Sequence, residues 1–225
     1  MKKKKLALIH TVSWYNKSVI EPFANDWSKK NPDVEIINIV DDSLLRESLE
    51  NGGASEAVLN RIINYVKSAE LAGADVVMIT CTTVGEASRM ARNIMSIPVF
   101  NIDEPMAREA VTRGRKLGIL ATVPTSAPAT KKLLEMEAKN AGKDIEITTV
   151  INEDAFKHLL AGNIEKHNEL VHHELDKLCE IVDVIVLGQI SLAQIIYHAA
   201  IPVLQVGHSG FQEAARLLKR VGVKE

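Results

Sequence analysis

The sequence lacks the features that mark several large classes of protein. It has two cysteines in 225 residues, too few for a disulfide framework, and this favours a reducing cytoplasm. No apolar run approaches the ~20 residues of a membrane-spanning helix, and a formal net charge of −2 gives no basic footprint for nucleic acid. The lysines at positions 2–5 precede an apolar stretch too short for a secretory leader. We therefore expect a cytoplasmic protein without nucleic-acid or membrane partners.

Nucleotide and metal motifs are also missing. Neither a G-x-G-x-x-G pattern nor a Walker pattern occurs. His167, His172 and His173 share one predicted helix, but their spacing suits a common metal ion poorly. The sequence predicts no metal site.

An internal repeat organises the chain. Three blocks recur in the same order with offsets of 111, 108 and 104 positions: Leu6–Val12 with Leu117–Val123, Asp75–Cys81 with Asp183–Gln189, and Ile97–Ile102 with Ile201–Val206. This period is too long for a solenoid. It indicates two copies of one α/β unit.

Short apolar runs alternate with helical patterns along both copies. Helices are predicted over 54–71, 127–141, 163–181 and 208–221, with Gly73 and Gly142 as stops. Continuously apolar runs are typical of strands covered on both faces. The expected strands are Leu6–His10, Val34–Val40, Val76–Thr80, Val99–Ile102, Leu117–Ala121, Ile145–Val150, Val184–Leu187 and Val203–Val206.

This alternation predicts an α/β fold with mainly parallel sheets and right-handed crossovers. We expect two similar, pseudo-symmetric three-layer α/β/α domains. The first comprises residues 1–106 plus 208–225, and the second comprises residues 107–207.

Hydroxyl-rich loops follow the first and third strand of each copy. Ligands of parallel sheets bind at the carboxyl ends of the strands, and loops that open helices present free N–H groups to a carboxylate. Capping of the helices is the alternative role for these hydroxyls. The candidate substrate-binding residues are Thr11, Ser13, Thr82, Thr83, Thr122, Thr125, Ser126 and Ser191.

The two cysteines differ in setting. Cys81 leaves a buried strand into a hydroxyl-rich turn, which suits acid/base chemistry on a small acid. Cys179 lies within a predicted helix and is interpreted as a small buried side chain.

Four segments together resemble the aspartate/glutamate racemase superfamily, especially its hydantoin-racemase-like branch: Cys81–Thr83, Pro98–Ala107, Lys116–Thr122 and Val186–Gln189. The resemblance extends over nearly the whole chain. It implies two similar α/β domains with the active-site cleft between them, and an enzyme without a cofactor. It further implies a small carboxylate or amino-acid-like substrate and a homo-oligomer, often a dimer.

One position departs from this family pattern. Family members commonly carry one cysteine after each matching strand; Cys81 stands at the first position and Gln189 at the second. Racemisation without a cofactor needs a base on one face of the α-carbon and an acid on the other. A thiol, which titrates near ~8.5, can take either part. An amide exchanges no proton at neutral pH, but it can donate to a carboxylate or an oxyanion.

The residue that serves the second face is therefore open. His208 follows the last predicted strand, and Glu104 is its counterpart in the repeat. Asp103 and His10 also stand at strand ends. We predict Cys81, Gln189 and His208 as the catalytic residues.

Three functions fit the sequence. The first is a cofactor-independent racemase or isomerase with Cys81 as thiol acid/base. The second is a one-thiol lyase of the decarboxylase kind, in which Gln189 holds the carboxylate or oxyanion. The third is a non-catalytic protein that binds small acids.

Overall fold

The computed structural model describes residues 3–13 and 20–221. The chain divides into two compact units: unit 1 consists of Met1–Asp103 with Gly207–Glu225, and unit 2 of Glu104–Val206. Each unit contains one four-stranded sheet in which all neighbouring strands are parallel. The predicted α/β fold is confirmed.

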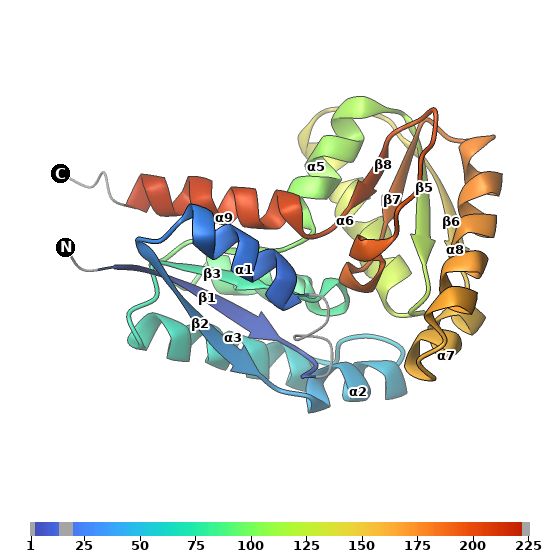
Figure 1. The fold of residues 1–225 in the computed structure, drawn as a ribbon. Helices are drawn as coiled ribbons and strands as arrows, with labels where there is room; N and C mark the ends of the chain where they lie inside the picture. Colours follow the sequence, from blue (N-terminus) through green and yellow to red (C-terminus); the bar gives the residue numbers. More distant parts are fainter. Residues whose placement is uncertain (1–2, 14–19, 222–225) are drawn as a thin grey trace. The chain divides into compact units, whose positions relative to one another are not determined.

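Unit 1 alternates strands and helices, and its last helix comes from the end of the chain (Figure 1). The strand order in its sheet is β2-β1-β3-β4. Its elements are β1 (Lys4–His10), α1 (Glu21–Lys30), β2 (Val34–Val40), α2 (Ser43–Glu50), α3 (Glu56–Leu71), β3 (Val76–Ile79), the 3-10 helix η2 (Thr82–Val84), α4 (Glu86–Arg92), β4 (Val99–Asn101) and α9 (His208–Val221).

The sheet of unit 1 is covered on both faces. Ala7, Ile9, Val77 and Ile79 form one core with α2, α3 and α4. Helices α1 and α9 cover the other face, where α9 contacts both β1 and β3 (Figure 1). Covered on both faces, these strands read as continuous apolar runs rather than as an alternation.

Unit 2 repeats this topology with the strand order β6-β5-β7-β8. Its elements are α5 (Glu104–Arg113), β5 (Lys116–Ala121), α6 (Ser126–Asn140), β6 (Glu146–Ile151), α7 (Glu153–Leu160), α8 (Ile164–Cys179), β7 (Val184–Leu187), the 3-10 helix η3 (Ile190–Gln194) and β8 (Val203–Gln205). Helices α7 and α8 share a core with Leu120, Ile185 and Leu187. Helices α5 and α6 also pack on the sheet, against β7 and β5 respectively.

Local signals explain where the long helices begin and end. Ser55 caps α3, because its hydroxyl accepts a hydrogen bond from the N–H of Val58 at 3.2 Å. Gly73 and Gly142 end α3 and α6 with φ of 82° and 64°, a backbone region that favours glycine. Both predicted stops are confirmed.

The repeat extends to individual contacts. Asp75 precedes β3 and accepts a hydrogen bond from the N–H of Lys5 at 2.8 Å. Asp183 precedes β7 and accepts one from the N–H of Lys116, also at 2.8 Å. The two aspartates therefore join the same two strands at the same end of each sheet, so positions can be compared between the units. In the described part of the chain, no helix is long and apolar enough to cross a membrane.

Candidate functional site

Cys81 lies at the carboxyl end of β3, between the buried strand and η2. Its sulfur accepts hydrogen bonds from the hydroxyl of Thr11, which follows β1, and from the backbone N–H groups of Thr83 and Val84. Because β1 and β3 are parallel neighbours, their carboxyl ends bring Thr11 and Cys81 together. The structure thus joins three predicted residues (Thr11, Cys81 and Thr83) and adds the N–H of Val84, which no side-chain pattern could reveal.

The environment of Cys81 favours the neutral thiol. Burial raises the pKa of Cys81, and the nearby carboxyl of Asp103 raises it further. The hydrogen bonds from Thr11, Thr83 and Val84 act in the opposite direction without cancelling the effect of burial. The residue keeps part of its surface exposed although its sulfur is largely desolvated. At neutral pH, the thiol of Cys81 therefore carries its proton.

The other hydroxyl residues of unit 1 lie in different settings. Thr82 is buried, and its hydroxyl has no hydrogen-bond partner among the described residues. Ser13 is exposed, and its backbone N–H donates to the carboxylate of Asp42. An unpaired buried hydroxyl costs about 1–3 kcal/mol, so Thr82 has unused capacity to bind a ligand.

His10 and Asp103 are candidates for the acid or base on the face of the substrate α-carbon opposite to Cys81. His10 is 1% exposed; its Nδ1 lies 2.9 Å from Thr80 Oγ1, and its Nε2 lies 2.9 Å from Asn38 Oδ1. Burial lowers the pKa of His10, and the hydrogen bond with Asn38 opposes this only in part. Asp103 is 2% exposed and accepts a hydrogen bond from Asn101 Nδ2 at 2.5 Å. At pH 7, His10 is therefore neutral, and both of its ring nitrogens are hydrogen-bonded. The charge of Asp103 acts on the thiol of Cys81 and raises its pKa.

His208 begins α9 and is exposed. Its ring packs edge-on against Phe23 of α1, with centroids 4.8 Å apart. Together with Asp26, Trp27 and other residues of α1 and α9, it lines a cavity of about 140 Å³. The contacts that the structure gives to His208 are thus with α1. The repeat counterpart Glu104 is buried in unit 2, 3.8 Å from Arg108.

Gln189 occupies in unit 2 the position that Cys81 has in unit 1. Its Oε1 accepts hydrogen bonds from the N–H groups of Thr122 and Val123, each at 2.9 Å, and lies 3.1 Å from Ser126 Oγ. Its Nε2 donates to the hydroxyl of Thr122 at 2.7 Å and to that of Ser191. Both amide protons are therefore engaged within unit 2.

The structure brings four of the predicted residues of unit 2 together around this amide: Thr122, Ser126, Gln189 and Ser191. Thr125 is buried directly before α6. Ser126 shares its single proton, because its hydroxyl also lies 2.8 Å from the carbonyl oxygen of Val123. Val123 takes part through its backbone N–H and carbonyl groups. The identity of its side chain therefore could not predict this contact.

The carboxyl end of β2 holds a polar network. The carboxylate of Asp41 accepts hydrogen bonds from Tyr65 at 2.6 Å, from Ser43 and from Arg61. Burial would raise the pKa of Asp41, but these hydrogen bonds outweigh it and hold the pKa at about 2. Sequence reasoning missed Arg61 and Tyr65. Their spacing of four residues on one helix was the available signal, because such residues share a face.

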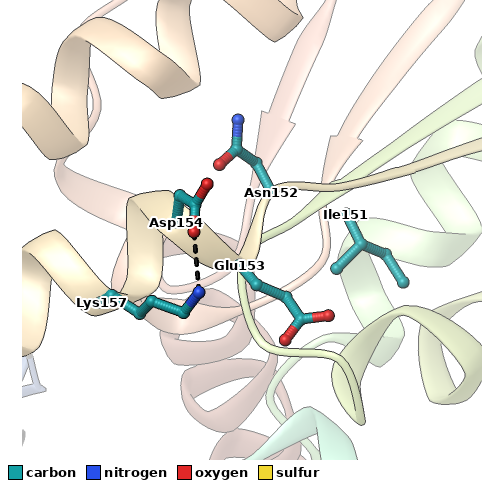
Figure 2. A pocket seen from close by; sticks show the side chains of 5 residues that line it. All are labelled: Ile151, Asn152, Glu153, Asp154 and Lys157. Atoms are coloured by element: carbon teal, nitrogen blue, oxygen red, sulfur yellow. Dashed lines mark hydrogen bonds and ion pairs between the residues drawn. The ribbon is translucent and has the colours of Figure 1, made fainter.

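The carboxyl end of β6 in unit 2 is open instead. A cavity of about 460 Å³ is lined by Ile151, Asn152, Glu153, Asp154 and Lys157 (Figure 2). Asn152 caps α7 by accepting a hydrogen bond from the N–H of Ala155 at 3.0 Å. Asp154 and Lys157 form an exposed ion pair of 2.8 Å (Figure 2). This polar surface has no ionisable group that is held in a buried geometry.

Neither the described histidines nor the acidic side chains form a metal cluster: no three His, Cys, Asp or Glu side chains within residues 3–13 and 20–221 gather to hold an ion. Cys179 is partly buried, and its sulfur lies 3.7 Å from the hydroxyl of Tyr197. Its described contacts lie in the core of unit 2.

The fold and the site define a class of protein: two repeated parallel α/β units, with a desolvated thiol at the end of the third strand of the first. A model of the Asp/Glu/hydantoin racemase family matches residues 18–199. This is more than half of the chain, and the chain therefore belongs to that family. Membership places it among the isomerases and supports a racemase function.

Solved structures share the fold. Picrophilus torridus aspartate racemase is 17% identical, with a TM-score of 0.67, over 97% of this chain and 94% of its own. An allantoin racemase from Klebsiella pneumoniae is 18% identical, with a TM-score of 0.66, over 98% and 89%. A glutamate racemase from Thermus thermophilus is 19% identical, with a TM-score of 0.69, over 100% and 84%. No curated protein sequence matches the chain significantly.

Proposed function

We propose that this protein is a cofactor-independent racemase or isomerase that acts on a small carboxylate or amino-acid derivative, with Cys81 as thiol acid/base. The observation that carries the proposal is the sulfur of Cys81 at the carboxyl end of β3, with three hydrogen-bond donors directed at it. Such donors stabilise a thiolate each time it forms, while the desolvated sulfur holds its proton between turnovers.

The proton transfers follow from this setting. As a base, the thiolate of Cys81 takes the proton from the acidic α-carbon, which forms an S–H bond and leaves the carbon electron pair delocalised onto the adjacent carboxyl or carbonyl group. As an acid, the thiol returns a proton to that carbon. Because burial raises the pKa of Cys81, the base step should accelerate as pH rises toward that pKa.

Racemisation needs a second proton donor on the opposite face, and Gln189 exchanges none. Asp103 is the ionisable residue that acts on Cys81 electrostatically, whereas His208 remains a candidate without a described contact to the thiol. The one-thiol lyase is the second proposal. Protonation of the carbanion left by carbon dioxide loss requires one thiol only, which Cys81 would supply. Because both amide protons of Gln189 already donate within unit 2, other donors would have to hold the carboxylate or oxyanion.

Hydrogen exchange at the substrate carbon tests these proposals. The enzyme is incubated in deuterated water with amino acids, hydantoins and malonates, and both deuterium uptake and carbon dioxide release are measured. Exchange with inversion supports the racemase, whereas carbon dioxide release supports the lyase. Binding without exchange would show a non-catalytic protein.

Matched variants assign the chemistry to the thiol. Cys81→Ala should abolish exchange, while Cys179→Ala should retain it because Cys179 packs against the hydrophobic core of unit 2. Full exchange in Cys81→Ala would overturn the role of Cys81.

Two further proposals concern the protein in the cell. We propose that the protein is cytoplasmic, which is supported by two cysteines that form no disulfide. We also propose that it is a homo-oligomer, which is supported by its resemblance to the racemase superfamily. Light scattering of the purified protein tests the oligomer, and a monomer at micromolar concentration would contradict it.

A further inference from the structure

A pair of successive backbone N–H groups binds one oxygen atom in unit 2. The N–H groups of Thr122 and Val123 both donate to Oε1 of Gln189 at 2.9 Å. We call this pair the 122–123 nest. Converging backbone N–H groups are a general device for binding a carboxylate or carbonyl oxygen. Here the bound oxygen belongs to the chain itself.

Gln189 fills this nest completely. Its side chain is 6% exposed, and its Nε2 is held by the hydroxyls of Thr122 and Ser191. An external carboxylate could enter the 122–123 nest only by displacing an amide that already makes all of its hydrogen bonds. The nest of unit 2 is thus closed from within.

The equivalent positions of unit 1 are Thr11 and Val12, each 111 positions before its counterpart. Cys81 stands where unit 2 has Gln189, and its sulfur accepts hydrogen bonds from the hydroxyl of Thr11 and from the N–H groups of Thr83 and Val84. No hydrogen-bond acceptor for the N–H groups of Thr11 and Val12 is found among residues 3–13 and 20–221. We call this pair the 11–12 nest.

A second observation in unit 1 also points to a ligand. The hydroxyl of Thr82, directly after Cys81, is shielded from solvent and has no partner in the same described residues. Unpaired buried polar groups are rare in folded proteins, and a bound ligand is one explanation for such a group beside a reactive side chain. The thiol of Cys81 therefore stands beside unused donors of two kinds, backbone and hydroxyl.

We propose that Gln189 is a built-in occupant of the 122–123 nest, and that the 11–12 nest is the equivalent site left open for one carboxylate or carbonyl oxygen of the ligand. The amide of Gln189 shows the ligand chemistry: a planar group whose oxygen accepts from two successive N–H groups. Binding at the 11–12 nest brings the carbon next to that group toward Cys81. This deepens the proposed function by assigning the acceptor site of unit 1.

Amide NMR tests the proposal without turnover. Uniformly ¹⁵N-labelled full-length protein is titrated with acetate and, separately, with acetamide, so that a carboxylate and a neutral carbonyl are distinguished. In the wild-type protein, saturable shifts are expected for the amide resonances of Thr11 and Val12 and not for those of Thr122 and Val123. Absence of a saturable shift at Thr11 and Val12 with both probes would overturn the open nest.

A variant of the occupant supplies the matched arm. Gln189→Gly should open the second nest, so that Thr122 and Val123 also respond to acetate; Gln189→Ala is the reserve variant if glycine impairs folding. Gln189→Glu keeps an acceptor oxygen and should leave both resonances insensitive. If neither small variant responds, Gln189 is not an occupant of a ligand site.

The outcome is separable from that of the proposed function. Saturable shifts without deuterium exchange would retain the nest and reject the catalysis. Exchange without shifts at Thr11 and Val12 would do the reverse.

Discussion

Units 1 and 2 differ most at the ends of their third strands. In unit 1, the position holds an ionisable thiol next to donors that have no described acceptor. In unit 2, the same position holds an amide that uses every hydrogen bond available to it. The strand end of unit 1 thus has donors left for a ligand, whereas the donors and acceptors at the strand end of unit 2 bind one another.

The ends of the second strands differ in the opposite direction. Unit 1 fills this place with Asp41, Arg61 and Tyr65 in one network. Unit 2 leaves a cavity of about 460 Å³ with an exposed ion pair of Asp154 and Lys157. Each unit is therefore closed at one loop and open at the other, which is how two copies of a fold diverge without a change in topology.

The largest effect should follow from the thiol. If unit 1 carries the chemistry, Cys81→Ser should slow α-carbon exchange by about 10²–10⁴-fold, the usual contribution of a positioned acid/base. Deuterium uptake by mass spectrometry measures it. Cys179→Ser serves as the control, and an equal loss there would break the comparison.

The closed amide of unit 2 should matter most for stability. Gln189→Ala leaves the N–H groups of Thr122 and Val123 without their acceptor, and we expect a loss of about 2–4 kcal/mol in the free energy of unfolding, because each unpaired buried group costs ~1–3 kcal/mol. Urea unfolding at pH 7 measures it. A loss below about 1 kcal/mol, the lower bound for one unpaired buried group, would contradict this role of the amide.

The second-strand comparison predicts a smaller difference. Arg61→Leu removes a partner of Asp41, whose side chain is 13% exposed, and should cost about 1–2 kcal/mol after allowance for solvent screening. Lys157→Leu removes an exposed partner and should change stability little. Parallel urea curves compare the two, and equal losses would remove the distinction.

The pH dependence sharpens this point. The pKa of Asp41 is lowered to about 2 from 3.8, so its contribution is complete above the unfolded value and is lost as pH falls from about 4 toward 2. Asp41→Asn should lose less stability over that range than the wild-type protein.

The smallest effect concerns the titration of Cys81. Because burial raises the pKa of Cys81, its alkylation should reach half of the maximal rate at a higher pH than alkylation of an ordinary thiol. The rate is measured in a Cys179→Ser background. Thr11→Val removes a hydrogen bond that lowers this pKa, and the midpoint should therefore rise further. Iodoacetamide rates followed by mass spectrometry give both values. A midpoint below that of a free thiol would contradict the desolvated setting.

Much of the fold was predictable from the sequence. The eight strands found in residues 3–13 and 20–221 lie within two residues of their predicted bounds. Strands such as Val76–Ile79 are buried on both faces and read as unbroken apolar runs. The stops at Gly73 and Gly142 follow from positive φ. Thr11 and Cys81 lie at the same edge of the sheet because β1 and β3 are parallel and both residues follow the carboxyl ends of these strands. The cleft expected between the domains stays a prediction.

The partners of the polar side chains were less accessible. His10 was a candidate base, yet Thr80 and Asn38 engage both of its ring nitrogens. Nothing in the loop after β2 points to Arg61, which donates to Asp41 from α3. A loop sequence names donors and acceptors, but it does not say which of them pair.

The amino-acid sequence by itself determined that this protein has two copies of a parallel α/β unit, one thiol at a strand end and an amide in place of a second. Apolar periodicity and residue identity carry that information locally. Only the tertiary structure decided that Gln189 turns its oxygen onto Thr122 and Val123, while Cys81 takes the hydroxyl of Thr11. Hydrogen bonds between residues about 70 positions apart depend on how strands and loops pack, and packing is a property of the whole unit.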